Sequence, residues 1–429
     1  MKPGAKRIAI LGAGPAGLTI ARLLMEQSDH SVTLFEKTHR VGGKSLSVRQ
    51  GEDLIEFGTC YTILSHRRVM DWMREQGITI QQIVPHKIDG IPARDFFNSG
   101  PGAPLAVQGI SYVLSRRKLL KALNSDTPPQ KALEEAATPA VDWLRARNLG
   151  KIEKMMMRTV TGMGYGDLKT VPIVHAMRWV DMDLILSGTL NKIYMPVEGW
   201  SEFWERLAKD MDVRLETHVR HIDRSGDQHM VVLDDGTEET FDALICAMPV
   251  DRFSALLEPT ESERVVGDSI HWGGYATTLI SSEDWFEEQI EYYSETCLPG
   301  VEPGLLMSAR REGYDAGLGG HLYIANQLPG DYTGPELIEI LREEVTRRGG
   351  SINAVIQQEV WEYFPEYDPG AIRKGLIARM RQMQGERQTL VYRRKLFARI
   401  GRQYLHSQRS PRATNAEGTW VKGIQKQRR

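Results

Sequence analysis

The stretch from Arg7 to Gly17 reads RIAILGAGPAG, and its pattern decides the fold. Its first half, RIAIL, is a short apolar run of the kind that forms a buried strand. The residues that follow the stretch, 18–25, have helical spacing and consist of good helix formers. A strand, a glycine-rich turn and a helix in this order begin a βαβ unit. We therefore predict an α/β fold with a parallel, Rossmann-type sheet at this end of the chain.

The residues of the turn indicate what the sheet binds. Gly12 permits a tight turn, Gly14 lets the backbone approach a pyrophosphate, and Gly17 lets the helix pack closely on the strand. Pro15 and Ala16 complete the turn at the start of the helix, whose free N–H groups and positive dipole end attract phosphate. The sequence therefore predicts a dinucleotide site formed by these five residues.

A carboxylate follows the next predicted strand. Residues 31–35, SVTLF, form that strand, and Glu36 comes directly after it, 24 residues beyond Gly12. A carboxylate at this separation accepts hydrogen bonds from both ribose hydroxyls of an adenosine. The same negative charge disfavours the 2′-phosphate of NADP.

A second glycine pair separates the candidate dinucleotides. After Glu36 the chain reads KTHRVGGKS, in which Gly42 and Gly43 stand between Arg40 and Lys44. An NAD dehydrogenase does not need a second glycine turn, whereas the flavin half of FAD passes a second backbone segment. The alternative is a surface turn after the strand. The stretch resembles the amine-oxidase-like FAD superfamily, whose members follow the acidic residue with R-x-G-G-[KR]; this resemblance implies FAD as cofactor, with Lys37, Arg40, Gly42, Gly43 and Lys44 beside it.

The resemblance also implies a discontinuous domain organisation, with an α+β substrate domain inserted between segments of the FAD-binding domain. The expected segments are 1–66, 194–270 and 355–392 for the FAD-binding domain, 67–193 and 271–354 for the substrate domain, and 393–429 for a basic, atypical tail. Residues 213–222, 230–233 and 240–248 have the pattern of three strands joined by hairpin turns. In the superfamily a backbone group at the position of Val219 pairs with the adenine edge.

Three residues of the predicted substrate domain are candidates for substrate binding. Arg94 lies among aromatic and apolar residues and is suited to hold a carboxylate, although a solvated ion pair is the commoner fate of such an arginine. Tyr165 lies in the loop 161–167, where glycines alternate with large side chains and let the backbone pass close to a flat group; a tight packed loop is the alternative. Met182 belongs to a methionine series that lines an apolar chamber or is plain core.

Several stretches resemble one branch of the superfamily, the polyenoic fatty acid isomerases. They are VGGK (41–44), EFG (56–58), GYG (164–166) with VP (171–172), GW (199–200), WEYFP (361–365) and MQGER (383–387). The resemblance implies that the flavin takes a hydride from a polyunsaturated fatty acid and returns it elsewhere on the chain, with Arg94 holding the carboxylate. Such chemistry needs no hydrolytic triad and no metal, because the cofactor carries the reaction.

Two other classes of function stay open. An amine oxidase or a desaturase would pass its electrons to oxygen or to another acceptor. A binding scaffold without flavin would show no flavin absorbance. In either case we expect a small-molecule partner rather than nucleic acid, and the oligomeric state is left open.

The composition is that of an ordinary globular protein. The chain has 429 residues and three cysteines, Cys60, Cys246 and Cys297, which form no CxxC pair. We therefore predict no metal site, no disulfide framework and a reducing, cytoplasmic setting.

The end of the chain departs from the superfamily pattern. The last 37 residues contain 11 Lys and Arg and one acid, Glu417, so the rest of the chain is acidic. After Leu390 the sequence VYRRKL lacks the glycine and the acid of the expected Y-A-G-[DE] turn, and this puts tight FAD binding in doubt. The tail is interpreted as a basic helix in weak peripheral contact with an anionic membrane, as a solvated end, or as the product of a changed reading frame.

Overall fold

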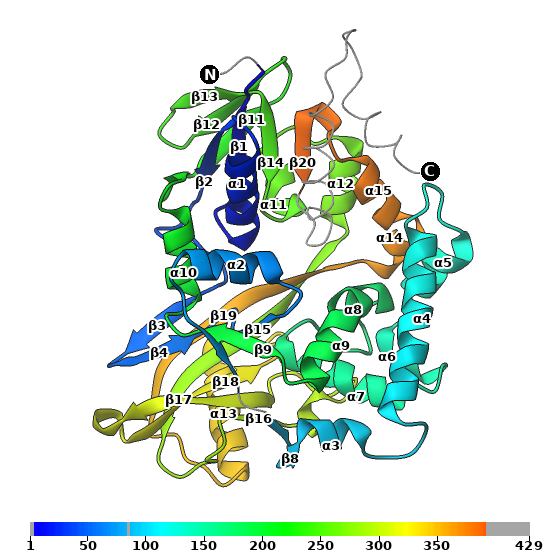
Figure 1. The fold of residues 1–429 in the computed structure, drawn as a ribbon, viewed down its shortest axis with the longest axis vertical. Coiled ribbons are helices and arrows are strands. Elements are labelled where there is room, and N and C mark those ends of the chain that lie inside the picture. The colour runs from blue at the N-terminus through cyan, green and yellow to red at the C-terminus, as the bar shows by residue number, and fades with distance from the viewer. Residues whose placement is uncertain (1–3, 84–85, 392–429) are drawn as a thin grey trace. The chain divides into compact units, whose positions relative to one another are not determined.

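The structure is a computed structural model that describes residues 4–83 and 86–391, and the described chain divides into two compact units. The first unit consists of residues 4–46, 200–268 and 379–391. The second consists of residues 47–83, 86–199 and 269–378. Figure 1 shows their helices and strands.

A parallel sheet forms the centre of the first unit. It has five strands in the order β10-β2-β1-β14-β20. Their bounds are Asp212–Arg214 (β10), Ser31–Phe35 (β2), Arg7–Leu11 (β1), Ala243–Cys246 (β14) and Thr389–Val391 (β20). Ile10 of β1 lies between Leu34 and Ile245 of the neighbouring strands and is fully buried. The predicted strands 7–11 and 31–35 are thereby confirmed. Their continuous apolar runs follow from burial on both faces of a parallel sheet.

A small antiparallel sheet in the same unit corrects the prediction of three strands. It contains β11 (Val219–Asp223), β12 (His229–Leu233) and β13 (Glu238–Phe241). The predicted strand 213–222 is in fact β10 and β11, because its first part pairs with β2 of the parallel sheet. The predicted strand 240–248 is likewise the end of β13 followed by β14.

Helices accompany the sheets of the first unit. They are α1 (Pro15–Gln27), α10 (Trp200–Ala208), α11 (Val250–Ser254) and α12 (Glu261–Asp268). Helix α1 lies against β1, as Figure 1 shows. The unit boundary after residue 378 falls within α15 (Leu376–Gln382).

The second unit contains a larger mixed sheet of seven strands in the order β19-β15-β18-β17-β16-β7-β8. The bounds are Ala354–Tyr367 (β19), Ile270–Ser282 (β15), Gly320–Gln327 (β18), Leu306–Asp315 (β17), Ile290–Tyr292 (β16), Lys87–Ile88 (β7) and Ile91–Pro92 (β8). Two smaller sheets contain β3 (Ser47–Gln50) with β4 (Asp53–Glu56), and β5 (Thr62–Ile63), β9 (Ile193–Pro196) and β6 (Ile80–Gln82).

Helices make up most of residues 67–193. They are α2 (Arg67–Glu75), α3 (Ala93–Asn98), α4 (Leu105–Leu123), α5 (Gln130–Ala136), α6 (Ala140–Arg145), α7 (Gly150–Thr159), α8 (Ile173–Trp179) and α9 (Met182–Thr189). Later in the unit come α13 (Gly334–Arg347) and α14 (Pro369–Arg373). None of the helices in the described ranges has the length and apolar character that would let it cross a membrane.

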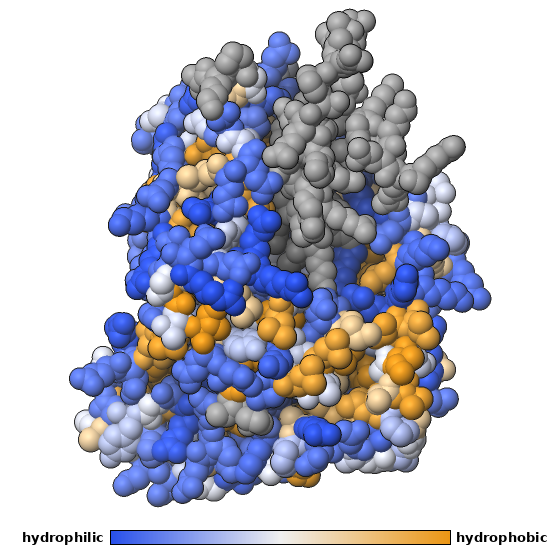
Figure 2. All heavy atoms as spheres, in the orientation of Figure 1, coloured by the Kyte–Doolittle hydropathy of each residue, from blue (hydrophilic) through white to orange (hydrophobic). Residues whose placement is uncertain are grey.

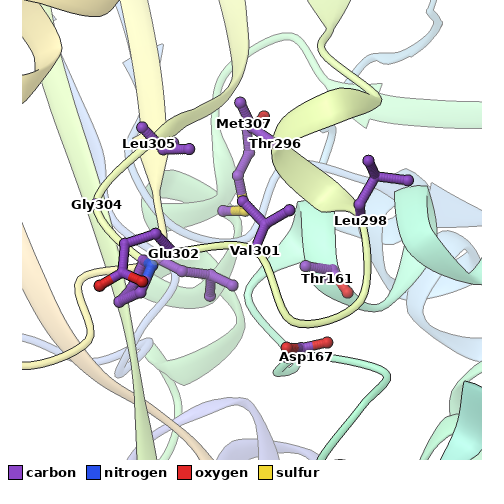
Figure 3. Close-up of a pocket in the computed structure, with 11 residues that line it drawn as sticks. Thr161, Asp167, Thr296, Leu298, Val301, Glu302, Gly304, Leu305 and Met307 are labelled. Atoms are coloured by element: carbon purple, nitrogen blue, oxygen red, sulfur yellow. The ribbon is translucent and has the colours of Figure 1, made fainter.

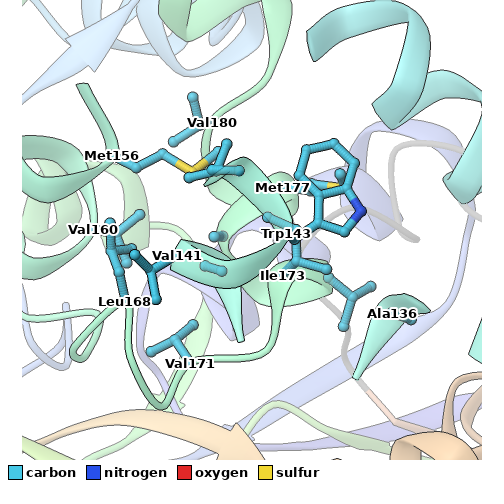
Figure 4. Close-up of a cluster of buried hydrophobic side chains, with 14 of the residues drawn as sticks. Ala136, Val141, Trp143, Met156, Val160, Leu168, Val171, Ile173, Met177 and Val180 are labelled. Atoms are coloured by element: carbon cyan, nitrogen blue, oxygen red, sulfur yellow. The ribbon is translucent and has the colours of Figure 1, made fainter. Parts of the chain in front are cut away.

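The helices pack around one buried cluster (Figure 4). Trp143, Met156 and Met177 belong to it, and Met155 and Met157 do as well. Four of the six methionines in the predicted series are therefore buried core residues. Met163 is partly buried against the same cluster, and Met182 is 41% exposed.

The compact units differ from the predicted domain segments at their ends. Residues 47–66 and 355–378 lie in the second unit, although they were predicted in the FAD-binding domain. The reason is strand pairing: β19 pairs with β15 over most of its length, and β4 contacts β17. The predicted tail, 393–429, lies outside the described residues.

Candidate functional site

The first glycine turn is closed by contacts that leave no room for side chains. Gly12 has φ +102° and its N–H donates to the Phe35 carbonyl at 2.8 Å. A Cβ at Gly17 would lie 1.9 Å from the Gly12 carbonyl oxygen. Both positions therefore require glycine, for the turn and for the close packing of α1 on β1.

The second glycine pair packs on the first turn. The Gly42 N–H donates to the Ala13 carbonyl at 2.9 Å, and a Cβ at Gly43 would lie 3.2 Å from the Gly14 Cα. The Arg40 guanidinium donates to the carbonyl oxygens of residues 41, 43 and 45. The second pair thus packs on the first glycine turn and is not an isolated surface turn.

Glu36 joins these segments. Its carboxylate accepts hydrogen bonds from the Ala13 N–H at 2.9 Å and from the N–H and hydroxyl of Thr38 at 3.0 and 2.9 Å. A carboxylate has about four acceptor positions, so it can still take a ribose hydroxyl. The Glu36 carbonyl accepts from the Thr217 N–H at 2.9 Å, which brings the chain to Val219 in the same unit. Lys37 is exposed and Lys44 is half-buried.

These residues fit FAD. Helix α1 begins at Pro15 after Gly14 with no side-chain cap and no acidic residue in its first turn. Its first N–H groups and its positive dipole end are therefore left for a phosphate, next to two glycine turns whose backbones lie against each other. Pro15 and Ala16 lie in the first turn of that helix, as the sequence predicts. The predicted C-terminal element of the site, after Leu390, begins at Val391 and from residue 392 lies outside the described residues.

The three candidate substrate-binding residues lie in different surroundings in the structure. Arg94 is exposed on α3, and Met182 is exposed at the start of α9. Tyr165 is 9% exposed, and its hydroxyl accepts from the Tyr363 hydroxyl at 2.9 Å. In the described part of the chain, none of these three residues contacts another of them. The tertiary structure therefore does not assemble them into one site.

The loop around Tyr165 packs tightly against the ring of Tyr275, which agrees with the alternative of a tight packed loop. A Cβ at Gly164 would lie 2.3 Å from the Tyr275 ring, and Gly164 has φ +76°. Tyr165 packs edge-on against Trp179 and Phe364, with centroid distances of 4.0 and 4.9 Å. An aromatic cluster around Tyr165 results.

A half-buried carboxyl group of β19, that of Glu366, lies against the same loop. A Cβ at Gly166 would lie 2.1 Å from Glu366 Oε1. Burial, and then repulsion from the Asp167 carboxylate, raise the pKa of Glu366 to about 7. Among the described residues, none forms a hydrogen bond with the Glu366 carboxyl group.

Sequence reasoning missed a buried arginine at the end of α7. Arg158 is 6% exposed, and no described residue forms a hydrogen bond with its Nε. Its guanidinium lies over the Tyr292 ring at 4.5 Å, and Nη2 donates to the Tyr292 hydroxyl at 3.2 Å. Within the described ranges no carboxylate forms an ion pair with it. The signal in the sequence was a basic residue three positions after Met155, on the apolar side of a helix.

The groups that surround Arg158 are neutral. Burial, and then the Arg158 charge, lower the pKa of His86 to about 2. Burial raises the pKa of the Cys297 thiol to about 12 and raises that of Tyr61 above its usual range. The Nε2 atom of His86 is also buried without a partner, and its ring packs edge-on against Tyr292 at 5.3 Å. A buried cation without a counter-ion is costly, so this position is suited to an anion.

A cavity of about 210 Å³ lies elsewhere in the second unit (Figure 3). Thr161, Leu298, Val301 and the carboxylates of Asp167 and Glu302 line it. Asp167 Oδ2 accepts from the Gly300 N–H at 2.7 Å, so the loop 298–305 is tied to the loop of Tyr165. Two acids make the cavity unsuited to a carboxylate ligand.

The comparison with protein families agrees with this geometry. The model of the family described as flavin containing amine oxidoreductase matches residues 15–289. That range begins at Pro15 of the first glycine turn and includes Gly17, Glu36 and the second glycine pair.

Two curated relatives and one solved structure are similar to the chain. The protein AofH of Mycobacterium tuberculosis, named as a flavin-containing monoamine oxidase, is 25% identical over 287 residues, which are 62% of either chain. The polyenoic fatty acid isomerase of Ptilota filicina is 22% identical over 277 residues, 56% of this chain and 55% of that protein. The chain thus spans less than two thirds of these relatives' length. The crystal structure of a CLA-producing fatty acid isomerase from P. acnes has a TM-score of 0.76 at 20% identity, over 90% of this chain and 93% of the other.

Proposed function

Because the chain belongs to the flavin-containing amine oxidoreductase family, we propose that it is an FAD enzyme acting by hydride transfer on an apolar, carboxylated substrate, in the manner of a polyunsaturated fatty acid isomerase. The cofactor of this family is FAD, and the chain is an FAD oxidoreductase. A binding scaffold without flavin, the third hypothesis of the sequence analysis, does not agree with that family.

The observation that carries the proposal is Arg158. Its guanidinium is buried, has no acidic partner in residues 4–83 and 86–391, and contacts Tyr292, which belongs to an apolar cluster. The cluster consists of Ile63, Ile83, Ile88, Ala93, Ile193, Ile290 and Tyr292, with Tyr61, Phe96, Phe97, Leu184 and Met195 packed against it. A long apolar acid satisfies both features, since its carboxylate pairs with the cation and its chain contacts the apolar side chains.

The protein's own part in the reaction is to bind and orient the substrate and to exclude water. When bound, FAD supplies a group that accepts a hydride and returns it. We propose that Arg158 fixes the carboxylate, that the apolar side chains around Tyr292 keep the neighbouring chain dry, and that the residues of the two glycine turns with Glu36 and Val219 hold the cofactor. Arg94, which is exposed on α3, is the alternative residue for this carboxylate contact.

Two measurements test the proposal. The absorbance spectrum of the purified protein, with identification of the released cofactor, tests the flavin. A linoleate-type acid added without oxygen should then bleach the flavin transiently or shift the diene absorbance. If the protein contains FAD and neither change occurs, isomerase activity on such acids is excluded, whereas the assignment as a flavoenzyme is retained.

A second candidate function is an amine oxidase or a desaturase. The aromatic side chains of Tyr165, Tyr275, Tyr363 and Phe364 favour it, because amine oxidases place aromatic residues against the flavin. A panel of amines tests this alternative. If an amine causes release of peroxide and the linoleate-type acid does not react, the protein is an amine oxidase rather than an isomerase.

A further inference from the structure

Helix α4 (Leu105–Leu123) has two different faces. Its inner face is buried: Tyr112, Leu119 and Leu123 are at most 2% exposed and belong to the helical core. The helix contains four basic residues, Arg116, Arg117, Lys118 and Lys121, and no acidic residue. Its outer face therefore has a chemistry that the core does not explain.

The outer face of α4 changes from apolar to basic along the helix. Val107, Ile110 and Leu114 are 54%, 63% and 62% exposed, and their spacing of three and four residues places them on one side. Arg117 and Lys118 continue that side at three and four residues beyond Leu114, and Lys121 follows Arg117 by four. These three bases are exposed, and in the described part of the chain none forms an ion pair. We define the α4 face as these six residues.

Helix α9 enlarges the apolar part. Met182, Leu186 and Leu190 recur every four residues and are 41%, 48% and 61% exposed. The inner side of α9, with Leu184 and Ile185, packs on the same core as α4. Figure 2 shows apolar side chains gathered over the half of α4 that contains Val107 and over α9, on the right of the view. Single exposed apolar residues are ordinary, whereas a patch over two helices marks a surface that contacts something.

We propose that the α4 face binds the surface of a membrane rich in anionic lipids. An amphipathic helix at such a surface places apolar side chains at the boundary of headgroups and acyl chains and basic side chains among the phosphates. The α4 face has both parts, each on the exposed side and in one continuous row. The phosphates of a nucleic acid would pair with the three basic side chains but would leave the three apolar side chains in water. The α4 face therefore fits a membrane better than a nucleic acid. The proposal holds whatever substrate the enzyme uses.

This surface differs from the one predicted from the sequence. The sequence predicts a weak membrane contact through the basic tail, which lies outside the described residues. Each basic residue near an anionic membrane strengthens binding by about five-fold. The three basic residues on α4 should therefore raise the affinity for an anionic membrane on the order of 100-fold. Substitution can distinguish an effect of this size from the contribution of the tail.

The experiment uses the full-length protein and sedimentation with vesicles. Vesicles of phosphatidylcholine alone are compared with vesicles that contain phosphatidylserine, at low and at high salt. Wild type should bind the anionic vesicles at low salt and lose most of that binding at high salt. The triple variant Arg117→Gln, Lys118→Gln, Lys121→Gln should bind on the order of 100-fold more weakly, and Val107→Ser, Ile110→Ser, Leu114→Ser at least about ten-fold more weakly.

Matched controls change the same residue types elsewhere. The triple variant Arg67→Gln, Lys131→Gln, Lys209→Gln removes three exposed bases from other helices or from a helix end, and Val265→Ser with Val360→Ser removes exposed apolar groups. These variants should bind as wild type does. All variants should unfold at the wild-type temperature, because every substituted side chain is exposed.

Three outcomes overturn the proposal. One is that wild type does not bind anionic vesicles. Another is that both α4 variants bind as wild type does while Arg393→Gln, Arg394→Gln, Lys395→Gln abolishes binding. A third is that wild type self-associates in sedimentation velocity, binds no vesicle, and becomes monomeric on Val107→Ser, Ile110→Ser, Leu114→Ser; the face would then contact a second copy of the chain.

Discussion

The Arg158 guanidinium lies over the Tyr292 ring, with Cζ 4.5 Å from the ring centroid and Nη2 3.2 Å from the hydroxyl oxygen that accepts its hydrogen bond. A tyrosine compensates a buried positive charge only in part, because its ring offers a quadrupole rather than a full charge. Arg158 is therefore a buried positive charge that no carboxylate of the described residues neutralises. This has consequences for the binding of an anion and for stability.

We expect Arg158→Met to weaken the binding of a saturated fatty acid by about 10- to 100-fold, because a charge-assisted hydrogen bond is lost. The binding of its methyl ester should be unchanged. Calorimetric titration of acid and ester with wild type and variant measures this. Arg94→Met is the control and should change acid binding by less than about two-fold; the reverse pattern would move the carboxylate to Arg94.

The same Arg158→Met substitution should leave the free energy of unfolding within about 1 kcal/mol of wild type or raise it, since it removes a buried charge without a partner. Urea unfolding of the ligand-free protein measures the difference. A loss of several kcal/mol would indicate instead that the arginine has a structural role.

Arg224 is also 6% exposed but, unlike Arg158, has an acidic partner. Its guanidinium forms a buried ion pair with Glu263 at 2.7 Å and donates to the Thr389 hydroxyl at 3.0 Å. We expect Arg224→Met to destabilise the protein by about 3–5 kcal/mol, because the Glu263 carboxylate is left buried and unpaired. Urea unfolding checks the value. The double variant with Glu263→Leu should recover most of the loss, and a double variant as unstable as the single one would contradict this explanation.

We expect Gly17→Ala to abolish retention of FAD and to destabilise the protein. A Cβ there would lie 1.9 Å from the Gly12 carbonyl oxygen, so α1 must move away from β1 and its N–H groups leave the phosphate position. The flavin absorbance of the purified variant measures the effect. Gly109→Ala is the control: it lies within α4 with no atom within 4 Å of the added Cβ, and it should stabilise the protein by about 0.5–1 kcal/mol. Flavin content equal to wild type in Gly17→Ala would exclude the proposed cradle.

Glu366 should make stability depend on pH. Its folded pKa of about 7 lies above the ordinary value of 4.5, so between these values the folded protein holds a proton that the unfolded chain has released. The free energy of unfolding should therefore fall as the pH rises from about 4.5 to 7. Glu366→Gln should remove this part of the slope and stabilise the protein by about 1–3 kcal/mol at pH 8. Unfolding by urea from pH 5 to pH 8 tests the slope.

A second variant separates the two causes of the Glu366 shift. Asp167→Asn removes the repelling carboxylate but leaves the burial, so it should reduce the slope without abolishing it. A slope unchanged in both variants would mean that another group titrates in this range.

Much of the cofactor half of the site could be predicted from the sequence. The strand 7–11, the glycines from Gly12 to Gly17 and Glu36 lie within 30 residues, and their spacing reflects local geometry that any tight strand–turn–helix requires. The ends of strands were predicted less well. Residues 213–222 divide into two strands because β2, more than 170 residues earlier in the chain, pairs with the first part only.

The sequence by itself determined the α/β fold, the glycine turn after β1 and the position of the acid after β2, because these depend on neighbours along the chain. Only the tertiary structure decided which arginine is buried. Arg94 has aromatic neighbours in sequence yet is exposed, whereas Arg158 is covered by Tyr292, 134 residues further on. Burial of a charge depends on what packs over it from elsewhere in the chain, and no local pattern contains that information.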